Sequence, residues 1–139
     1  MSTGILEHIN LTVSDPDATA ARLCALFGWK VRWSGQAISN GYTVHVGSDQ
    51  CYLAVYSKGD PAKSNDSSYD RVCGLNHVGV LVDDLQSVHK KVTDAGFETY
   101  NFGDYEPGRR FYFRDPDGIE FEVISYQDTS KALKKSLTS

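Results

Sequence analysis

The chain has 139 residues, of which 40% are hydrophobic and 23% charged, a composition that predicts one globular domain and excludes a disordered or fibrous chain. Its formal net charge of −4 is at odds with the concentrated basic surface that duplex binding needs, so no nucleic-acid partner is expected. No apolar run approaches the roughly 18–20 residues that span a bilayer, so no membrane partner is expected either.

Two further features predict a reduced, cytoplasmic protein. The first four residues, MSTG, carry neither a basic region nor an apolar segment of the kind that directs secretion. The cysteines Cys24, Cys51 and Cys73 are odd in number and widely spaced, which favours small buried thiols over disulfides.

An internal repeat organises the chain. Residues 6–15 (LEHINLTVSD) match residues 75–84 (LNHVGVLVDD) further along. Both segments alternate apolar and polar residues, as strands do, and both end in acidic residues that can cap a helix. Each half of the chain is therefore expected to begin with a strand that leads into a helix.

The first helix is predicted from residue 16 or 17 to 27 and the second from about 84 to 95. Each ends at a glycine, Gly28 or Gly96, which accepts the left-handed dihedrals found just past a helix. The expected apolar positions are Ala18, Ala21, Leu23, Cys24 and Phe27 in the first helix and Leu85, Val88 and Val92 in the second. His89 stands beside two lysines on the second helix and is expected to face solvent.

Short strands follow each helix, which makes two βαβββ modules. They are predicted at residues 30–34, 42–46 and 51–56, and at about 98–101, 110–114 and 119–125. Asp115-Pro116-Asp117-Gly118 is a strong turn, because proline presets one dihedral and glycine supplies the positive one. Within a single domain, residues 1–139, the modules cover about 5–57 and 74–126, with a polar linker at 58–73 and a polar tail at 127–139.

Period-two alternation brings out three candidate metal ligands. His8 lies opposite Ile9 and Leu11 in the first strand, and His77 occupies the matching position in the second repeat. Glu122 lies opposite its apolar neighbours in the last strand. If helices cover the apolar faces, His8, His77 and Glu122 project from the other face of a curved sheet. Two imidazoles and one carboxylate suit Fe(II) or Mn(II), with Ni(II) and Zn(II) as alternatives.

Three segments carry a family resemblance: residues 6–11 (LEHINL), 75–80 (LNHVGV) and 110–122 (RFYFRDPDGIEFE). With them, the sequence from about residue 6 to 126 resembles the vicinal oxygen chelate superfamily, which groups glyoxalase I, extradiol dioxygenases, fosfomycin-resistance enzymes and bleomycin-resistance proteins. The resemblance implies an α+β fold in which paired βαβββ modules form an incomplete, cup-shaped barrel around a metal. It also implies a homodimer, often with each site assembled from modules of both chains.

The resemblance assigns the metal ligands to His8, His77 and Glu122. Aligning residues 51–55 with 120–124 puts Leu53 at the fourth symmetric position, where leucine cannot coordinate a metal. This departure favours the two-His-one-carboxylate site of dioxygenases and fosfomycin-modifying enzymes over the four-ligand site of glyoxalase I.

The same resemblance suggests three catalytic residues. Tyr112 matches the family tyrosine and could hydrogen-bond a metal-bound oxygen. The acid–base histidine of the dioxygenases does not carry over, since Cys51 lies near its position, and His45 is the candidate substitute. Arg110, with Arg109 beside it, could pair with an anionic substrate, because guanidinium groups suit carboxylates and phosphonates. Both arginines would equally suit the rim of the site.

The sequence thus predicts a metal-dependent enzyme whose metal acts as a Lewis acid on a small substrate that chelates through vicinal oxygens, with a dioxygenase-like site. A glyoxalase-type lyase or isomerase and a fosfomycin-type thiol transferase are the alternatives, although Asn10 replaces the threonine of the fosfomycin branch. An alternative of another class is a non-catalytic antibiotic-binding protein with an aromatic-lined cleft, for which the chain offers Trp33, Tyr42, Tyr52, Tyr56, Tyr100 and Tyr105.

Overall fold

The computed structural model describes residues 2–64, 66–103 and 108–126. The chain divides into two compact units, residues 1–64 and 65–139, which are described one at a time. The boundary lies inside the predicted linker. The predicted tail at 127–139 and Tyr105 lie outside the described residues.

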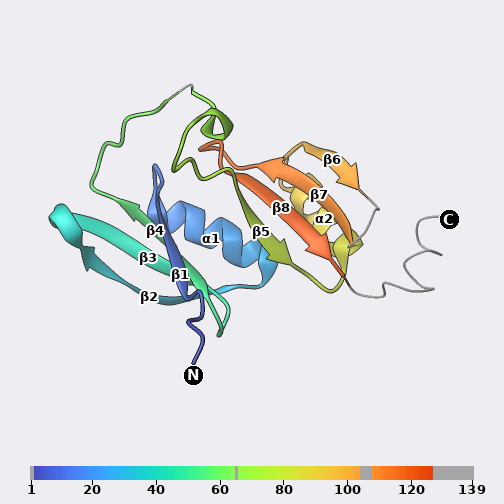
Figure 1. Cartoon of the computed structure of the whole chain (residues 1–139), viewed down its shortest axis with the longest axis horizontal. Coiled ribbons are helices and arrows are strands. Elements are labelled where there is room, and N and C mark those ends of the chain that lie inside the picture. Colours follow the sequence, from blue (N-terminus) through green and yellow to red (C-terminus); the bar gives the residue numbers. More distant parts are fainter. Residues whose placement is uncertain (1, 65, 104–107, 127–139) are drawn as a thin grey trace, which may run out of the picture. The chain divides into compact units, whose positions relative to one another are not determined.

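Unit 1 is a βαβββ module with an open four-stranded sheet in the order β1-β4-β3-β2 (Figure 1). β1 runs parallel to β4, and the other neighbours are antiparallel. Its elements are β1 (His8–Thr12), α1 (Pro16–Phe27), β2 (Lys30–Ala37), a 3₁₀ turn (Ile38–Asn40), β3 (Gly41–Gly47) and β4 (Tyr52–Ser57).

Unit 2 repeats this topology with the sheet order β5-β8-β7-β6, and β5 runs parallel to β8. Its elements are a 3₁₀ turn (Ser68–Asp70), β5 (His77–Leu81), α2 (Leu85–Asp94), β6 (Thr99–Gly103), β7 (Arg109–Arg114) and β8 (Glu120–Ser125). The prediction of an α+β fold with two βαβββ modules is therefore confirmed.

Both helices begin and end as the sequence predicts. Asp15 and Asp84 are the N-caps, and their carboxylates accept hydrogen bonds from the third residue of each helix, Ala18 at 3.2 Å and Ser87 at 3.0 Å. Gly28 and Gly96 take the positive φ values of 69° and 93° that stop a helix.

Each helix packs on one face of its own sheet, and the core of each unit lies between its helix and its sheet. In unit 1 the fully buried side chains include Leu23 of α1 and Val44, Val46 and Val55 of the sheet. In unit 2 they include Val92 of α2 and three phenylalanines of the sheet, Phe111, Phe113 and Phe121. The opposite face of each sheet carries polar and aromatic side chains.

Some details of burial differ from the sequence prediction. Ala18 and Ala21 of α1 are exposed, whereas Thr19, Ala20 and Leu26 are buried, because the sheet contacts a stripe displaced around the helix. Cys51 and Cys73 are exposed instead of buried, since both lie in turns outside the core, and Cys24 is half-buried. None of the helices in the described residues is long and apolar enough to cross a bilayer.

His89 was expected to face solvent, and this prediction is wrong. Its ring packs edge-on against Phe111 at 5.0 Å, and its Nε2 lies 3.0 Å from the Thr99 hydroxyl. His89 also lines a cavity of about 350 Å³ beside α2, together with Leu85, Gln86, Phe102, Gly103, Arg109, Arg110 and Phe111. Alternation along β7 places Arg109 with Phe111 on this α2 side of the sheet.

Candidate metal centre

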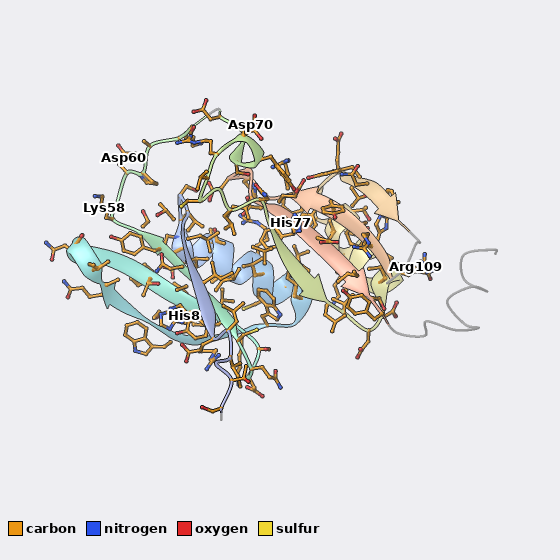
Figure 2. The ribbon with its side chains drawn as sticks, in the orientation of Figure 1. His8, Lys58, Asp60, Asp70, His77 and Arg109 are labelled. Carbon is orange, nitrogen blue, oxygen red and sulfur yellow. The ribbon has the colours of Figure 1, made fainter. Side chains whose placement is uncertain are left out.

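The strand register of unit 2 collects polar side chains on the face away from α2. Gly79 of β5 pairs with Glu122 of β8, Glu122 pairs with Tyr112 of β7, and Tyr112 pairs with Tyr100 of β6. His77 lies two residues before Gly79 on the same face, while Val78 and Val80 point into the core. Figure 2 labels His77 and its counterpart His8, each on the first strand of its unit.

His77 and Glu122 form the centre of this face. Nε2 of His77 lies 3.1 Å from Oε2 of Glu122. The other carboxylate oxygen, Oε1, accepts a hydrogen bond of 2.8 Å from Nη1 of Arg110. The side chains of Arg110 and Glu122 are only 11% and 12% exposed, so this ion pair is largely shielded from water. Arg110 is therefore shielded from water beside Glu122.

The second nitrogen of His77 contacts a tyrosine hydroxyl. Nδ1 lies 3.2 Å from the Tyr69 oxygen, and the Tyr69 hydroxyl donates a 2.6 Å hydrogen bond to Oε1 of Glu120. Oε2 of Glu120 accepts from Tyr100 at 2.7 Å and from Arg114 at 3.3 Å. Glu120 is thus a buried carboxylate surrounded by donors.

These contacts shift the pKa values of Glu120 and of the two tyrosines that donate to it. Burial raises the pKa of Glu120, but the hydrogen bonds from Tyr69 and Tyr100 and the charges of Arg114 and His77 outweigh it and leave that pKa below its usual range. The hydrogen bond to Glu120 raises the pKa of Tyr69. Burial, followed by the hydrogen bond to Glu120, raises the pKa of Tyr100 to about 12. Both tyrosines therefore stay protonated donors at neutral pH.

The geometry at His77 fits a divalent cation. If Nδ1 carries the proton of the neutral ring, Nε2 presents a lone pair to an oxygen of Glu122 at 3.1 Å. Two acceptors at this separation repel each other, and a cation or a proton between them removes that repulsion. Two ligand atoms bound to one cation at about 2.1 Å and at a right angle are about 3 Å apart, which matches the observed separation.

Unit 1 carries His8 at the position equivalent to His77. Its Nδ1 lies 2.8 Å from Oε1 of Glu7, which leaves Nε2 pointing away from that carboxylate. The His8 ring stacks on Tyr52 at 4.9 Å, and Tyr52 stacks on His45 at 4.5 Å. His45 in turn contacts Trp33 at 5.1 Å, so the four rings form an aromatic row across the whole sheet.

A cation and a partly desolvated histidine belong to this aromatic row. The Arg32 guanidinium lies 4.6 Å above the Tyr52 ring. Burial, followed by the nearby charges of His8 and Arg32, lowers the pKa of His45 below its usual range. His45 pairs with Ala54 in the register of β3 and β4, as Tyr112 pairs with Glu122 in β7 and β8. The two predicted catalytic residues are therefore equivalents of each other in the repeat.

The alignment that placed Leu53 opposite Glu122 is wrong by one residue. His8 pairs with Tyr52 and His77 pairs with Glu120, so Tyr52 corresponds to Glu120 and Ala54 to Glu122. Leu53 is 6% exposed in the core beneath α1. The inference survives the correction, because alanine cannot coordinate a metal either.

The predicted residues therefore lie in two groups. In unit 2, His77, Glu122 and Arg110 are in direct contact, and the His77 ring meets Tyr112 edge-on at 5.7 Å. In unit 1, His8 and His45 belong to the aromatic row. Over the described ranges, no three His, Cys, Asp or Glu side chains are gathered in a way that could hold a metal ion.

Sequence reasoning missed Tyr69 altogether, because it lies in the stretch predicted as a linker. The available signal was weak: Tyr69 is the only aromatic residue in an otherwise polar segment from 58 to 73. The contacts of Glu120 with Tyr69 and Arg114 were not predicted either.

Comparison with known proteins decides the family. The profile described as "Glyoxalase/Bleomycin resistance protein/Dioxygenase superfamily" matches residues 5–123. The chain belongs to this superfamily. Over 130 residues it is 25% identical to the uncharacterized protein YaeR of Escherichia coli (strain K12), covering 85% of this chain and 93% of YaeR.

Solved structures of the superfamily share the fold. The fosfomycin resistance protein FosX of Listeria monocytogenes, crystallised with Mn(II) and sulfate, has a TM-score of 0.67 and 21% identity, covering 90% of this chain and 93% of FosX. The antibiotic-binding protein TnmS3 of Streptomyces sp. CB03234 has a TM-score of 0.70 and 15% identity, with 90% and 98% covered. One structural relative is thus a resistance protein and the other a binding protein.

Proposed function

We propose that the protein is a divalent-metal-dependent enzyme of this superfamily that acts on a small substrate with two adjacent oxygens. His8, His77 and Glu122 would be the metal ligands, and Fe(II) or Mn(II) the favoured ions. The Mn(II) in the FosX structure supports a divalent metal in this fold. A two-His-one-carboxylate site leaves coordination positions open, as a dioxygenase-like reaction requires.

One observation carries the proposal: the convergence of His77 and Glu122. Their other polar atoms contact Tyr69 and Arg110, so the atoms left facing each other, Nε2 and Oε2, are those that a metal would need. An ion pair with a purely structural role would not need a second contact, at Nδ1, to orient the imidazole. Orientation of that kind is typical of metal-binding histidines.

The surrounding residues have distinct tasks in this proposal. The bound metal would supply Lewis acidity, which polarises a substrate oxygen. Arg110 holds one oxygen of Glu122 and so fixes the direction of the other. Tyr112, beside the His77 ring, is the candidate to donate or accept the proton of a substrate oxygen, and His45 is the candidate base of unit 1.

Metal analysis tests the site. Protein purified without chelators is expected to carry near-stoichiometric Fe, Mn, Ni or Zn, and His77→Ala and Glu122→Gln are expected to lose it. His89→Ala is the matched control and should keep the metal. His89 belongs to the same unit but packs against Phe111, on the side of the sheet that faces α2. Full occupancy in His77→Ala would overturn the assignment.

The reaction class has its own test. Protein reconstituted with Fe(II) without oxygen is given catechols and then O₂, beside parallel assays with a hemithioacetal and with fosfomycin plus a thiol. Ring cleavage that disappears in Glu122→Gln and Tyr112→Phe is the expected result. Activity in another assay alone would replace the dioxygenase assignment with a lyase or a thiol transferase.

The aromatic row favours a second candidate, a non-catalytic binder of flat molecules. Trp33, Tyr52 and the two histidines gather on one side of a sheet, and an aromatic surface can bind such molecules without a metal. The likeness to TnmS3 is consistent with this alternative. Binding of an aromatic antibiotic that is unaffected by chelators and by His77→Ala would favour it over the enzyme.

A further inference from the structure

We propose that Tyr69 is a positioning residue that fixes the proton of the His77 ring on Nδ1 and thereby keeps Nε2 available as a ligand atom. This inference rests on the proposed function, in which Nε2 binds the metal.

The distances show that the tyrosine hydroxyl mediates the contact between His77 and Glu120. Nδ1 of His77 is 3.7 Å from Oε1 of Glu120, which is too far for a hydrogen bond. The Tyr69 oxygen lies 3.2 Å from Nδ1 and 2.6 Å from the same carboxylate oxygen, so it bridges the two.

The direction of the hydrogen bonds follows from the donors present. Glu120 receives Tyr69, Tyr100 and Arg114, and a carboxylate can only accept. A tyrosine hydroxyl has one proton, and here the shorter bond takes it to Glu120. The Tyr69 oxygen can then only accept from His77, so Nδ1 carries a proton, and in the neutral ring the lone pair is on Nε2.

The chain around Tyr69 holds it in place. The Ser67 hydroxyl accepts a 3.2 Å hydrogen bond from the Tyr69 amide, which starts the 3₁₀ turn. A side chain at Gly74 would collide with the backbone carbonyl of Ser68, so only glycine lets the chain pass this close. The turn thus has a defined path although more than half of the Tyr69 surface is exposed.

Tyr100 provides a matched control. Its hydroxyl donates to the other oxygen of Glu120, at 2.7 Å, and not to His77. Removing either hydroxyl takes one donor from the same carboxylate. Only removal of the Tyr69 hydroxyl takes the acceptor from Nδ1.

The first experiment measures the ring tautomer in the full-length, metal-free protein. Long-range ¹H–¹⁵N spectra at alkaline pH, where a free imidazole is neutral, report which ring nitrogen carries the proton. His77 is assigned by the loss of its signals in His77→Gln. We expect Nδ1–H in the wild type and in Tyr100→Phe. In Tyr69→Phe the proton should move to Nε2, where Oε2 of Glu122 lies 3.1 Å away as an acceptor.

The second experiment measures Mn(II) affinity by competition with a chelator. Tyr69→Phe is expected to bind Mn(II) about 10- to 100-fold more weakly, the usual cost of losing a partner that orients a ligand. Tyr100→Phe should stay within about threefold of the wild type, well short of that cost. Equal losses in both variants would show that Tyr69 acts through Glu120 alone and would overturn the proposal.

The two readouts separate this inference from the proposed function. An Nε2–H ring in the wild type, or an unchanged tautomer in Tyr69→Phe, overturns the role of Tyr69 even if metal binds. A wild type without affinity for Mn(II), Fe(II), Ni(II) or Zn(II) overturns the metal enzyme, while a tautomer change confined to Tyr69→Phe still supports the positioning of His77.

Discussion

Glu122 faces two partners with its two carboxylate oxygens, Arg110 on one side and His77 on the other. Arg110 offsets the cost of keeping that carboxylate largely out of water, and it leaves one oxygen directed at the imidazole. The guanidinium would therefore contribute to stability and to the shape of the site together.

Replacing Arg110 with methionine should reveal its contribution to stability. The change leaves Glu122 shielded and without its cation, so the free energy of unfolding of metal-free protein should fall by about 3 kcal/mol, as for a broken buried pair. Arg114→Met is the control: Arg114 is 52% exposed, and the loss there should be about 1 kcal/mol or less. Urea denaturation measures both, and equal losses would contradict the argument.

His45 should make the stability of the metal-free protein depend on pH. Burial and the charges of His8 and Arg32 lower its pKa below the usual 6.5, so the unfolded chain binds the proton more readily than the folded chain. The contribution of neutral His45 is complete above pH 6.5 and is lost as the pH falls through the lower, folded-state pKa. Thermal melts between pH 8 and pH 5 should show this fall, and His45→Gln should flatten it. An unchanged slope would count against the burial of His45.

At the scale of single residues, the sequence predicted His77 and Glu122 correctly as neighbours on one sheet face. Period-two alternation suffices for that, because it depends on the strand alone. Tyr69 could not be predicted, since its contact with Glu120 spans 51 positions and leaves no local pattern. Ion pairs such as Arg110–Glu122 have the same difficulty, because their register depends on how two strands align.

At the scale of the elements, the position of β8 depends on the turn that precedes it, residues 115–118. Oδ1 of Asp115 accepts hydrogen bonds of 2.9 Å from the amides of Asp117 and Ile119, and Gly118 takes the positive φ of 85°. This turn delivers Glu120 and Glu122 to the face that holds His77. The Asp115-Pro116-Asp117-Gly118 motif therefore helps to determine where these two carboxylates lie.

Asp115→Ala should therefore destabilise unit 2. It leaves two amides without their acceptor, and the expected loss is about 1–3 kcal/mol. Asp115→Asn keeps an oxygen at the same position and should lose less than half as much. Chemical denaturation gives the comparison. If Asn and Ala cost the same, the charge of Asp115 would matter more than its two hydrogen bonds.

The elements also show where sequence reasoning reaches its limit. Helix ends were predicted to within a residue, because Asp15, Gly28, Asp84 and Gly96 act locally. The counterpart of Glu122 was placed at Leu53 instead of Ala54, because two strands were aligned without knowledge of their register. A slip of one residue exchanges the two faces of a strand.

For the whole molecule, the proposal takes His8 from one unit and His77 from the other. We predict a homodimer in which each site uses ligands from both chains, as the family resemblance implies. When His8→Ala and His77→Ala chains are mixed after partial unfolding, half of the dimers should be mixed and one of their two sites intact. Metal content should then recover to about a quarter of the wild-type value under two-fold symmetry.

Each variant alone should bind little metal, which is the baseline of that experiment. Recovery requires that the chains exchange, and differently tagged copies followed by native mass spectrometry establish this. If mixed dimers form and no metal returns, each site is built within one chain.

The turn around Tyr69 also changes where the second repeat should be said to start. Matching strands put its first residue near 74, yet the hydroxyl that reaches His77 arrives from five positions earlier. A gene fusion or module exchange joined at residue 74 would carry over the histidine and both carboxylates but not the side chain that orients the ring. A junction near residue 65, where the second compact unit begins, would keep the tyrosine, the histidine and both carboxylates together.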